Sequence, residues 1–335
     1  MSEGRVSFAR AFARSGKGRV LQLIVSGAVI AYLVWQIDVG RTVHYIGGAN
    51  GLYLLGALLI FLATTWGMAW RWQLLLRSKG IDEPLGWLTS LYFVGYAAGQ
   101  ILPTSVGGDA VRFVEHARRR PDVKGEAAGA ILMERLLGSA GTLVMVAIGL
   151  LLAIGRYDGI RLLVYLELAF VAGMAALGVL LFSRRAAHLM RWLGPLVTRL
   201  RLERAARSLY QALHGYRDRV GVLVLILAAT VGLQFVRVTA IWLCGKAVGL
   251  DLSPLPYVIL GPLLFLVMLV PFTINGLGVR EAFFVAFLAR FDVNADAAFA
   301  TGFLFYAVTV ATSVPGGVIL LWRSIKPAVV RARRA

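Results

Sequence analysis

The feature that most constrains this chain is a series of apolar segments long enough to cross a lipid bilayer. A bilayer core of about 30 Å is spanned by roughly 20 apolar residues in a helix. Six segments reach that length: about 20–37, 52–76, 128–154, 161–182, 221–248 and 297–322. Hydrophobic residues make up 59% of the chain and charged residues only 16%, which excludes a soluble enzyme, a disordered chain and a coiled coil. The sequence therefore predicts an all-α integral membrane protein with about six transmembrane helices.

Two further apolar segments, about 86–113 and 255–290, are interrupted by clusters of Pro and Gly. Basic residues begin at the end of the first segment and continue beyond it: Arg112, Arg118, Arg119, Arg120 and Lys124. If that segment crossed the membrane, the basic run would lie outside, whereas Lys and Arg favour cytoplasmic loops. The conflict disappears if each segment leaves the membrane on the side where it enters. We therefore predict two re-entrant helical hairpins, with tips at 103–108 (entered from the cytoplasm) and 271–278 (entered from outside).

The basic residues also set the expected orientation. Lys and Arg are frequent in both terminal segments and in 183–220, but 38–50 has one basic residue and 249–256 has none. Both termini of this multi-pass protein are therefore expected in the cytoplasm, and the membrane is expected to be the cell inner (plasma) membrane. The net charge is +18, and the basic loops that carry it are expected to interact with anionic lipids of the cytoplasmic leaflet and not with nucleic acid. Apolar residues at helical spacing, with Arg on the other faces, predict a cytoplasmic amphipathic interfacial helix over 184–219.

The two hairpin tips are similar to each other in sequence. Residues 103–112 align without gaps with 271–280, an offset of 168 residues, and four of the ten positions are identical. The same offset carries two of the expected spans onto two others, in the opposite orientation. We therefore predict a single membrane domain, 1–335, with inverted repeats over 51–154 and 219–322, a plan in which transporters bind substrate near the midplane between broken helices. Two unrelated Gly/Pro loops are the alternative.

Ionisable side chains inside the apolar segments are candidate binding residues, because a charge at the centre of a membrane helix costs about 2.5–3.5 kcal/mol. Arg237 lies near the middle of its span and is expected to face an internal cavity; a structural pair with an acidic residue is the alternative. Glu134 and Arg135 lie within another span. Adjacent residues on a helix point about 100° apart, so these two are expected to have different partners. Arg71, near the cytoplasmic end of its span, is expected to snorkel.

Each predicted tip ends with an arginine, Arg112 or Arg280, where a returning half-helix would begin. A helix N-terminus supplies free N–H groups, and an adjacent Arg completes an anion site. A lipid phosphate is therefore the expected ligand, and the two arginines are expected at the two ends of one path along which it moves. The alternative for Arg112 is a position at the cytoplasmic surface. Asp109 is expected to balance Arg112, and Leu277 takes its place in the second tip. The expected substrate-binding residues are Arg112, Arg237, Arg280, Glu134, Arg135, Glu281, Asp109 and Asn275.

Four motifs carry a resemblance to a known family. They are QILPTSVGGDAVR over 100–112, ILMERLLG over 131–138, PFTINGLGVREAF over 271–283, and Gly316-Gly317. Together they resemble the lysylphosphatidylglycerol synthase transmembrane-region family, whose members are also described as flippase-like integral membrane proteins. The resemblance covers essentially the whole chain and implies a helical domain that moves or accommodates lipids with anionic or modified head groups. In aminoacyl-lipid members a soluble transferase domain follows this region. Here the sequence stops shortly after the last span, so aminoacyl transfer from tRNA is not expected.

The sequence shows no motif typical of a metal site or a nucleotide site. It also shows no acid/base pair typical of an enzyme, since Glu134, Glu167 and Glu281 lie on separate segments. We therefore predict a non-enzymatic lipid translocase without a cofactor, which passes a phospholipid or a polyprenyl-phosphate-linked lipid across the inner membrane. The expected partners are membrane lipids with anionic head groups, a glycosyl- or aminoacyl-transferase, and a second copy of the chain. The alternatives are a non-transporting lipid-binding accessory subunit, a membrane-embedded enzyme of lipid or cell-envelope modification, and a transporter of small solutes or ions.

Overall fold

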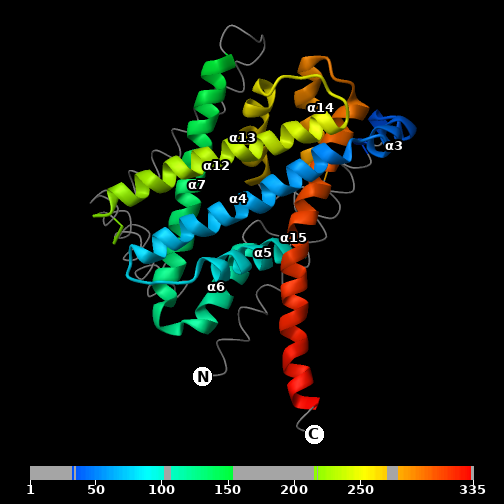
Figure 1. Cartoon of the computed structure of the whole chain (residues 1–335). Helices are drawn as coiled ribbons and strands as arrows, with labels where there is room; N and C mark the ends of the chain where they lie inside the picture. Colours follow the sequence, from blue (N-terminus) through cyan, green and yellow to red (C-terminus); the bar gives the residue numbers. More distant parts are fainter. Residues whose placement is uncertain are drawn as a thin grey trace, which may run out of the picture.

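The computed structural model describes residues 32–33, 35–101, 107–153, 215–216, 218–269 and 278–332. All regular secondary structure within these residues is helical (Figure 1). Several predictions fall wholly or mostly outside the described residues: the span 161–182, most of the span 20–37, most of the interfacial helix over 184–219, most of both hairpin tips, and Asn275.

Four helices are long and apolar enough to cross a membrane. They are α4 (Gly51–Arg77), α7 (Lys124–Ala153), α12 (Val220–Ala247) and α15 (Ala295–Ala332). The first residue of each helix lies within four residues of the first residue of a predicted span. The Asn50 carboxamide caps α4 by accepting a hydrogen bond from Leu52 N at 2.9 Å. These helices establish a multi-pass membrane protein, while the total of six crossings stays a prediction.

Each of the two interrupted apolar segments forms a pair of helices. The pairs are α5 (Leu85–Ile101) with α6 (Gly107–Arg119), and α13 (Leu255–Leu269) with α14 (Val279–Leu288). Helices α5 and α6 approach closely at two glycines, because a Cβ on Gly108 would lie 2.6 Å from Gly95 O. Glu83 before α5 and Arg120 after α6 are 3.5 Å apart (Oε1 to Nη1). The first segment therefore begins and ends at the same place, which supports the predicted re-entrant hairpin.

A short helix, α3 (Val39–Gly47), occupies the connection that precedes α4. Asp38 caps it by accepting a hydrogen bond from Arg41 N at 3.0 Å. The backbone of Asp38 in turn donates to Asp296 Oδ1 of α15 at 2.8 Å. The connection is therefore a packed element and not an open loop.

The order of helices in the first half recurs in the second. Adding 168 to the bounds of α4 and α5 gives 219–245 and 253–269, within two residues of α12 and α13. The same shift carries the short helix η1 (Pro121–Val123) onto η3 (Ala289–Phe291). Packing recurs as well: α4 contacts α5 as α12 contacts α13, and α5 contacts α15 as α13 contacts α7.

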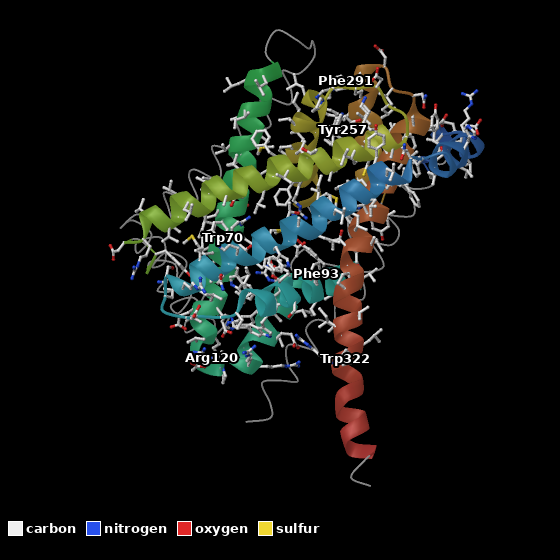
Figure 2. The ribbon with its side chains drawn as sticks, viewed as in Figure 1. Trp70, Phe93, Arg120, Tyr257, Phe291 and Trp322 are labelled. Carbon is white, nitrogen blue, oxygen red and sulfur yellow. The ribbon has the colours of Figure 1, made fainter. Side chains whose placement is uncertain are left out.

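Corresponding helices also run in opposite directions. Figure 1 shows α4 and α12 crossing the centre of the molecule with opposite chain directions. In the same view the chain runs upward along α7 and downward along α15. In Figure 2, Arg120 beside η1 and Phe291 in η3 lie at opposite ends of the molecule. These features support the inverted repeats over 51–154 and 219–322, which stay a prediction.

Candidate functional site

Glu134 lies at the centre of a buried ionic cluster beside the first hairpin. Its side chain projects from α7 and the residue is 6% exposed. Arg112 Nη2 of α6 donates a hydrogen bond to Glu134 Oε2 at 2.9 Å, and the Tyr92 hydroxyl of α5 donates to Oε1. Arg71 Nη2 of α4 lies 3.7 Å from the same Oε1. One carboxylate therefore joins four helices.

A second carboxylate, Asp109, extends this cluster. Its Oδ1 accepts a hydrogen bond from Arg112 Nη1 at 2.9 Å, and its Oδ2 accepts one from Arg135 Nε at 2.5 Å. Glu134 and Arg135 thus have different partners, and Asp109 balances Arg112, as predicted. Arg112 is 5% exposed, and its guanidinium carbon lies 3.6 Å from the centroid of the Tyr92 ring. It does not occupy the surface position that was the alternative.

Arg71 corrects the prediction that this side chain snorkels to the membrane surface. The residue is 4% exposed, because the Glu134 carboxylate lies deep on α7 and attracts the guanidinium inward. Its Nε has no hydrogen-bond partner among the described residues. Sequence reasoning also missed Tyr92. The one sequence feature that pointed to such a partner is Glu134, because an acid within a membrane span needs hydrogen-bond or ionic partners. The sequence does not show which apolar segment supplies them.

The second hairpin carries a self-contained ion pair. Arg280 and Glu281 are 2% and 3% exposed, and Arg280 Nη2 lies 2.7 Å from Glu281 Oε1. Glu281 Oε2 accepts a hydrogen bond from Gly278 N at 2.7 Å, so it also caps α14. The Arg280 guanidinium lies 4.3 Å from the centroid of the Tyr306 ring on α15. Arg280 is the second residue of α14, as expected for the start of a returning half-helix, whereas Arg112 is the sixth residue of α6.

Arg237 is half-buried on α12 and is directed toward α4. Its Nη1 lies 3.4 Å from Met68 Sδ, and its guanidinium carbon lies 4.8 Å from the centroid of the Phe61 ring. Among the residues that the structure describes, no carboxylate lies within 4.0 Å of this guanidinium. The acidic partner proposed as the alternative is therefore not found in the described part. That these arginines and acids bind a substrate stays a prediction.

The described helices define a class: a multi-pass helical membrane protein with ionic clusters at two interrupted helices. The chain belongs to the lysylphosphatidylglycerol synthase transmembrane-region family, which matches residues 19–317. It is also similar to Glycosyltransferase AglD of Haloferax volcanii, with 27% identity over 339 residues that cover 89% of this chain and 53% of that protein. The chain thus spans about half the length of this relative. The family match agrees with the multi-pass membrane protein that the described helices indicate.

Proposed function

We propose that the protein is a lipid translocase of the inner membrane, which passes a phospholipid or a polyprenyl-phosphate-linked lipid between the leaflets, with both termini in the cytoplasm. The observation that carries this proposal is the buried cluster around Glu134. Ionisable groups within membrane segments are costly and generally mark a substrate pathway. Irregular backbone at membrane depth is tolerated only where protein or a water-filled cavity surrounds it. The cluster lies beside the place where the first interrupted apolar segment is divided between two helices, α5 and α6.

The guanidinium groups suit a phosphate-bearing head group. Arginine offers two parallel donors that match phosphate oxygens, whereas lysine offers a point charge. Arg112 and Arg280 stand beside the two tips, and each is held by a carboxylate. An incoming phosphate would exchange with Asp109 or Glu281, so the guanidinium would not be left without an anion during the exchange.

The test is translocation in liposomes that contain the purified chain. We expect fluorescent phosphatidylglycerol, or a labelled polyprenyl phosphate, to reach the opposite leaflet faster than in protein-free vesicles, as measured by dithionite quenching. Arg280→Gln should slow this transfer, and Arg118→Gln, which alters an exposed arginine, should not. Wild-type transfer no faster than in protein-free vesicles for both lipids would refute the translocase. Wild-type rates for Arg280→Gln would make Arg280 only a structural partner of Glu281.

A second candidate is a membrane-embedded enzyme that glycosylates a lipid without transporting it. It is favoured by the similarity to Glycosyltransferase AglD, of which this chain spans about half. Purified chain incubated with a sugar nucleotide and polyprenyl phosphate should yield no glycosylated lipid if the translocase proposal is right. We expect this result because Glu134 and Glu281 are each bound in ion pairs, so neither is free to act as a general base.

A further inference from the structure

Among the described residues, Arg237 differs from the other arginines that are buried or partly buried, because each of those has a carboxylate within 4.0 Å. Arg71, Arg112, Arg135 and Arg280 each have a carboxylate within 4.0 Å. Arg237 has a thioether and an aromatic ring instead. These contacts are weak compared with an ion pair, and a cation at membrane depth without an anion is costly. This position therefore retains the capacity to bind an anion.

A continuous series of contacts links Arg237 to the first hairpin. The guanidinium carbon of Arg112 lies over the Tyr92 ring at 3.6 Å, and that ring lies 6.3 Å from the ring of Tyr96. The Tyr96 hydroxyl lies 3.1 Å from Met68 Sδ, and the same sulfur lies 3.4 Å from Arg237 Nη1. Tyr92 and Tyr96 are one turn apart on α5, so they lie on one face of that helix.

A second series of contacts leads from Arg237 to the other hairpin. Its guanidinium carbon lies 4.8 Å from the centroid of the Phe61 ring, which lies 5.7 Å from that of Phe305. The Phe305 ring in turn lies 6.0 Å from that of Phe284. Phe284 is on α14, four residues after Arg280. Arg237 therefore stands between the two hairpins, with polarisable side chains on both sides.

The repeated arrangement does not account for an arginine at this position. The offset of 168 residues pairs Arg112 with Arg280, but it pairs Arg237 with Ala69, which is fully buried. We propose that Arg237 is the mid-membrane contact for the phosphate of a lipid head group as it passes between the two hairpins. This inference rests on the proposed translocase function and names the residue that receives the anion in the middle of the path. Arg237, Met68 and Tyr96 are only partly buried, which leaves this contact accessible.

Binding in detergent tests this inference separately from transport. The probes are dioctanoyl phosphatidic acid and dioctanoyl glycerol, which differ by the phosphate alone. We expect wild-type protein to bind the phosphate lipid more tightly, and Arg237→Met to raise its Kd at least tenfold without changing that of the glycerol lipid. Lys246→Met is the matched control, because Lys246 lies near the end of the same helix and pairs with exposed Asp251; it should leave both values unchanged. An Arg237→Met Kd within twofold of wild type would overturn the proposal.

A second pair of variants leaves Arg237 in place. Met68→Glu should place a carboxylate beside Nη1 and abolish the preference for the phosphate lipid. Met68→Gln, of similar size and without charge, should keep that preference. Equal binding of the phosphate lipid by both variants would contradict the proposal, even if Arg237→Met did not fold. A wild-type protein that does not distinguish the two lipids would also overturn it.

Transport separates this inference from the proposed function. If Arg237→Met loses phosphate binding while the wild type moves no lipid in vesicles, Arg237 is an anion site and the translocase is wrong. If the wild type moves labelled phosphatidylglycerol and Arg237→Met moves it equally fast, the translocase stands and the mid-membrane role of Arg237 is wrong.

Discussion

At the residue scale, Glu134 and Asp109 determine how the first hairpin holds its positive charge. Glu134 is shared by Arg71 and Arg112, and Asp109 by Arg112 and Arg135. Removing one partner of a buried ion pair costs about 3–5 kcal/mol, because the other charge stays buried without compensation. An exposed pair contributes only about 0–1 kcal/mol. The two carboxylates are therefore expected to stabilise the fold when no lipid is bound.

Replacing Glu134 tests this structural role. We expect Glu134→Gln to lower the melting temperature in detergent strongly, in line with a loss of about 3–5 kcal/mol. Adding Arg71→Met should recover part of the loss, because Glu134 is the only carboxylate within 4.0 Å of Arg71 among the described residues, whereas Arg112 keeps Asp109. Glu115→Gln is the control: Glu115 pairs with the exposed Arg118 and the partly exposed Arg323, so little change is expected. Equal effects of the two single substitutions would show that burial does not matter here.

His116 provides a pH-dependent element at the end of α6. It is fully buried, between the rings of Trp72 and Trp87 at 5.7 and 5.4 Å. Burial lowers the pKa of His116, and the positive charges of Arg120 and Arg119 lower it further. A histidine with a lowered pKa in the folded state is protonated more readily when unfolded. Its contribution is therefore fully present above the ordinary histidine pKa and is lost as the pH falls below it.

Replacing His116 with phenylalanine should remove part of this pH dependence. Neither ring nitrogen of His116 has a hydrogen-bond partner among the described residues, so phenylalanine should fill the same space without losing a hydrogen bond. We expect the melting temperature of the wild type to fall between pH 7.5 and pH 5.5, and that of His116→Phe to fall less. Parallel curves would indicate that another group controls the acid sensitivity.

At the scale of the elements, apolar length and Pro/Gly clusters predict most of the described helices. The sequence correctly predicts the four long helices and the interruption of both shorter apolar segments. It does not predict α3, because a nine-residue helix in a connection depends on packing against α15 and on Asp296 as a partner. The contacts of Glu134 are also beyond sequence reasoning. Its partners Arg71 and Tyr92 lie on other helices, and interhelical contacts follow from packing and not from local pattern.

The contact between α5 and α15 gives a matched prediction at two adjacent glycines. A Cβ on Gly316 would lie 1.8 Å from Phe93 O, a backbone atom that cannot turn aside, whereas a Cβ on Gly317 would meet nothing within 4 Å. Figure 2 shows Phe93 where α5 meets α15. Gly316→Ala should therefore force the helices apart and cost about 1–3 kcal/mol. Gly317→Ala should be neutral or slightly stabilising, since alanine favours helix. Equal melting temperatures for the two variants would contradict this close approach.

At the scale of the whole molecule, the two halves place corresponding elements at opposite ends. The segment between Glu83 and Arg120 starts and ends at one point. The segment after α12 likewise begins and ends in one cluster, because Leu250, Leu252 and Val293 pack against the same buried residues. Two hairpins that open toward opposite membrane surfaces would let a head group enter from either leaflet. This is the geometry that an alternating exchange between leaflets requires.

Cysteine labelling in intact cells tests this arrangement. The chain has one cysteine, the buried Cys244, so Cys244→Ala gives a background without thiols. Asp82→Cys and Asp122→Cys flank the first hairpin, and Ser253→Cys and Ala289→Cys flank the second; all four positions are exposed. A membrane-impermeant maleimide should label the second pair from outside and the first pair only after the cells are opened. If Asp82→Cys and Asp122→Cys label from different sides, the first hairpin crosses the membrane. If all four label from one side, the two halves are not inverted, and a path between opposite leaflets loses its structural basis.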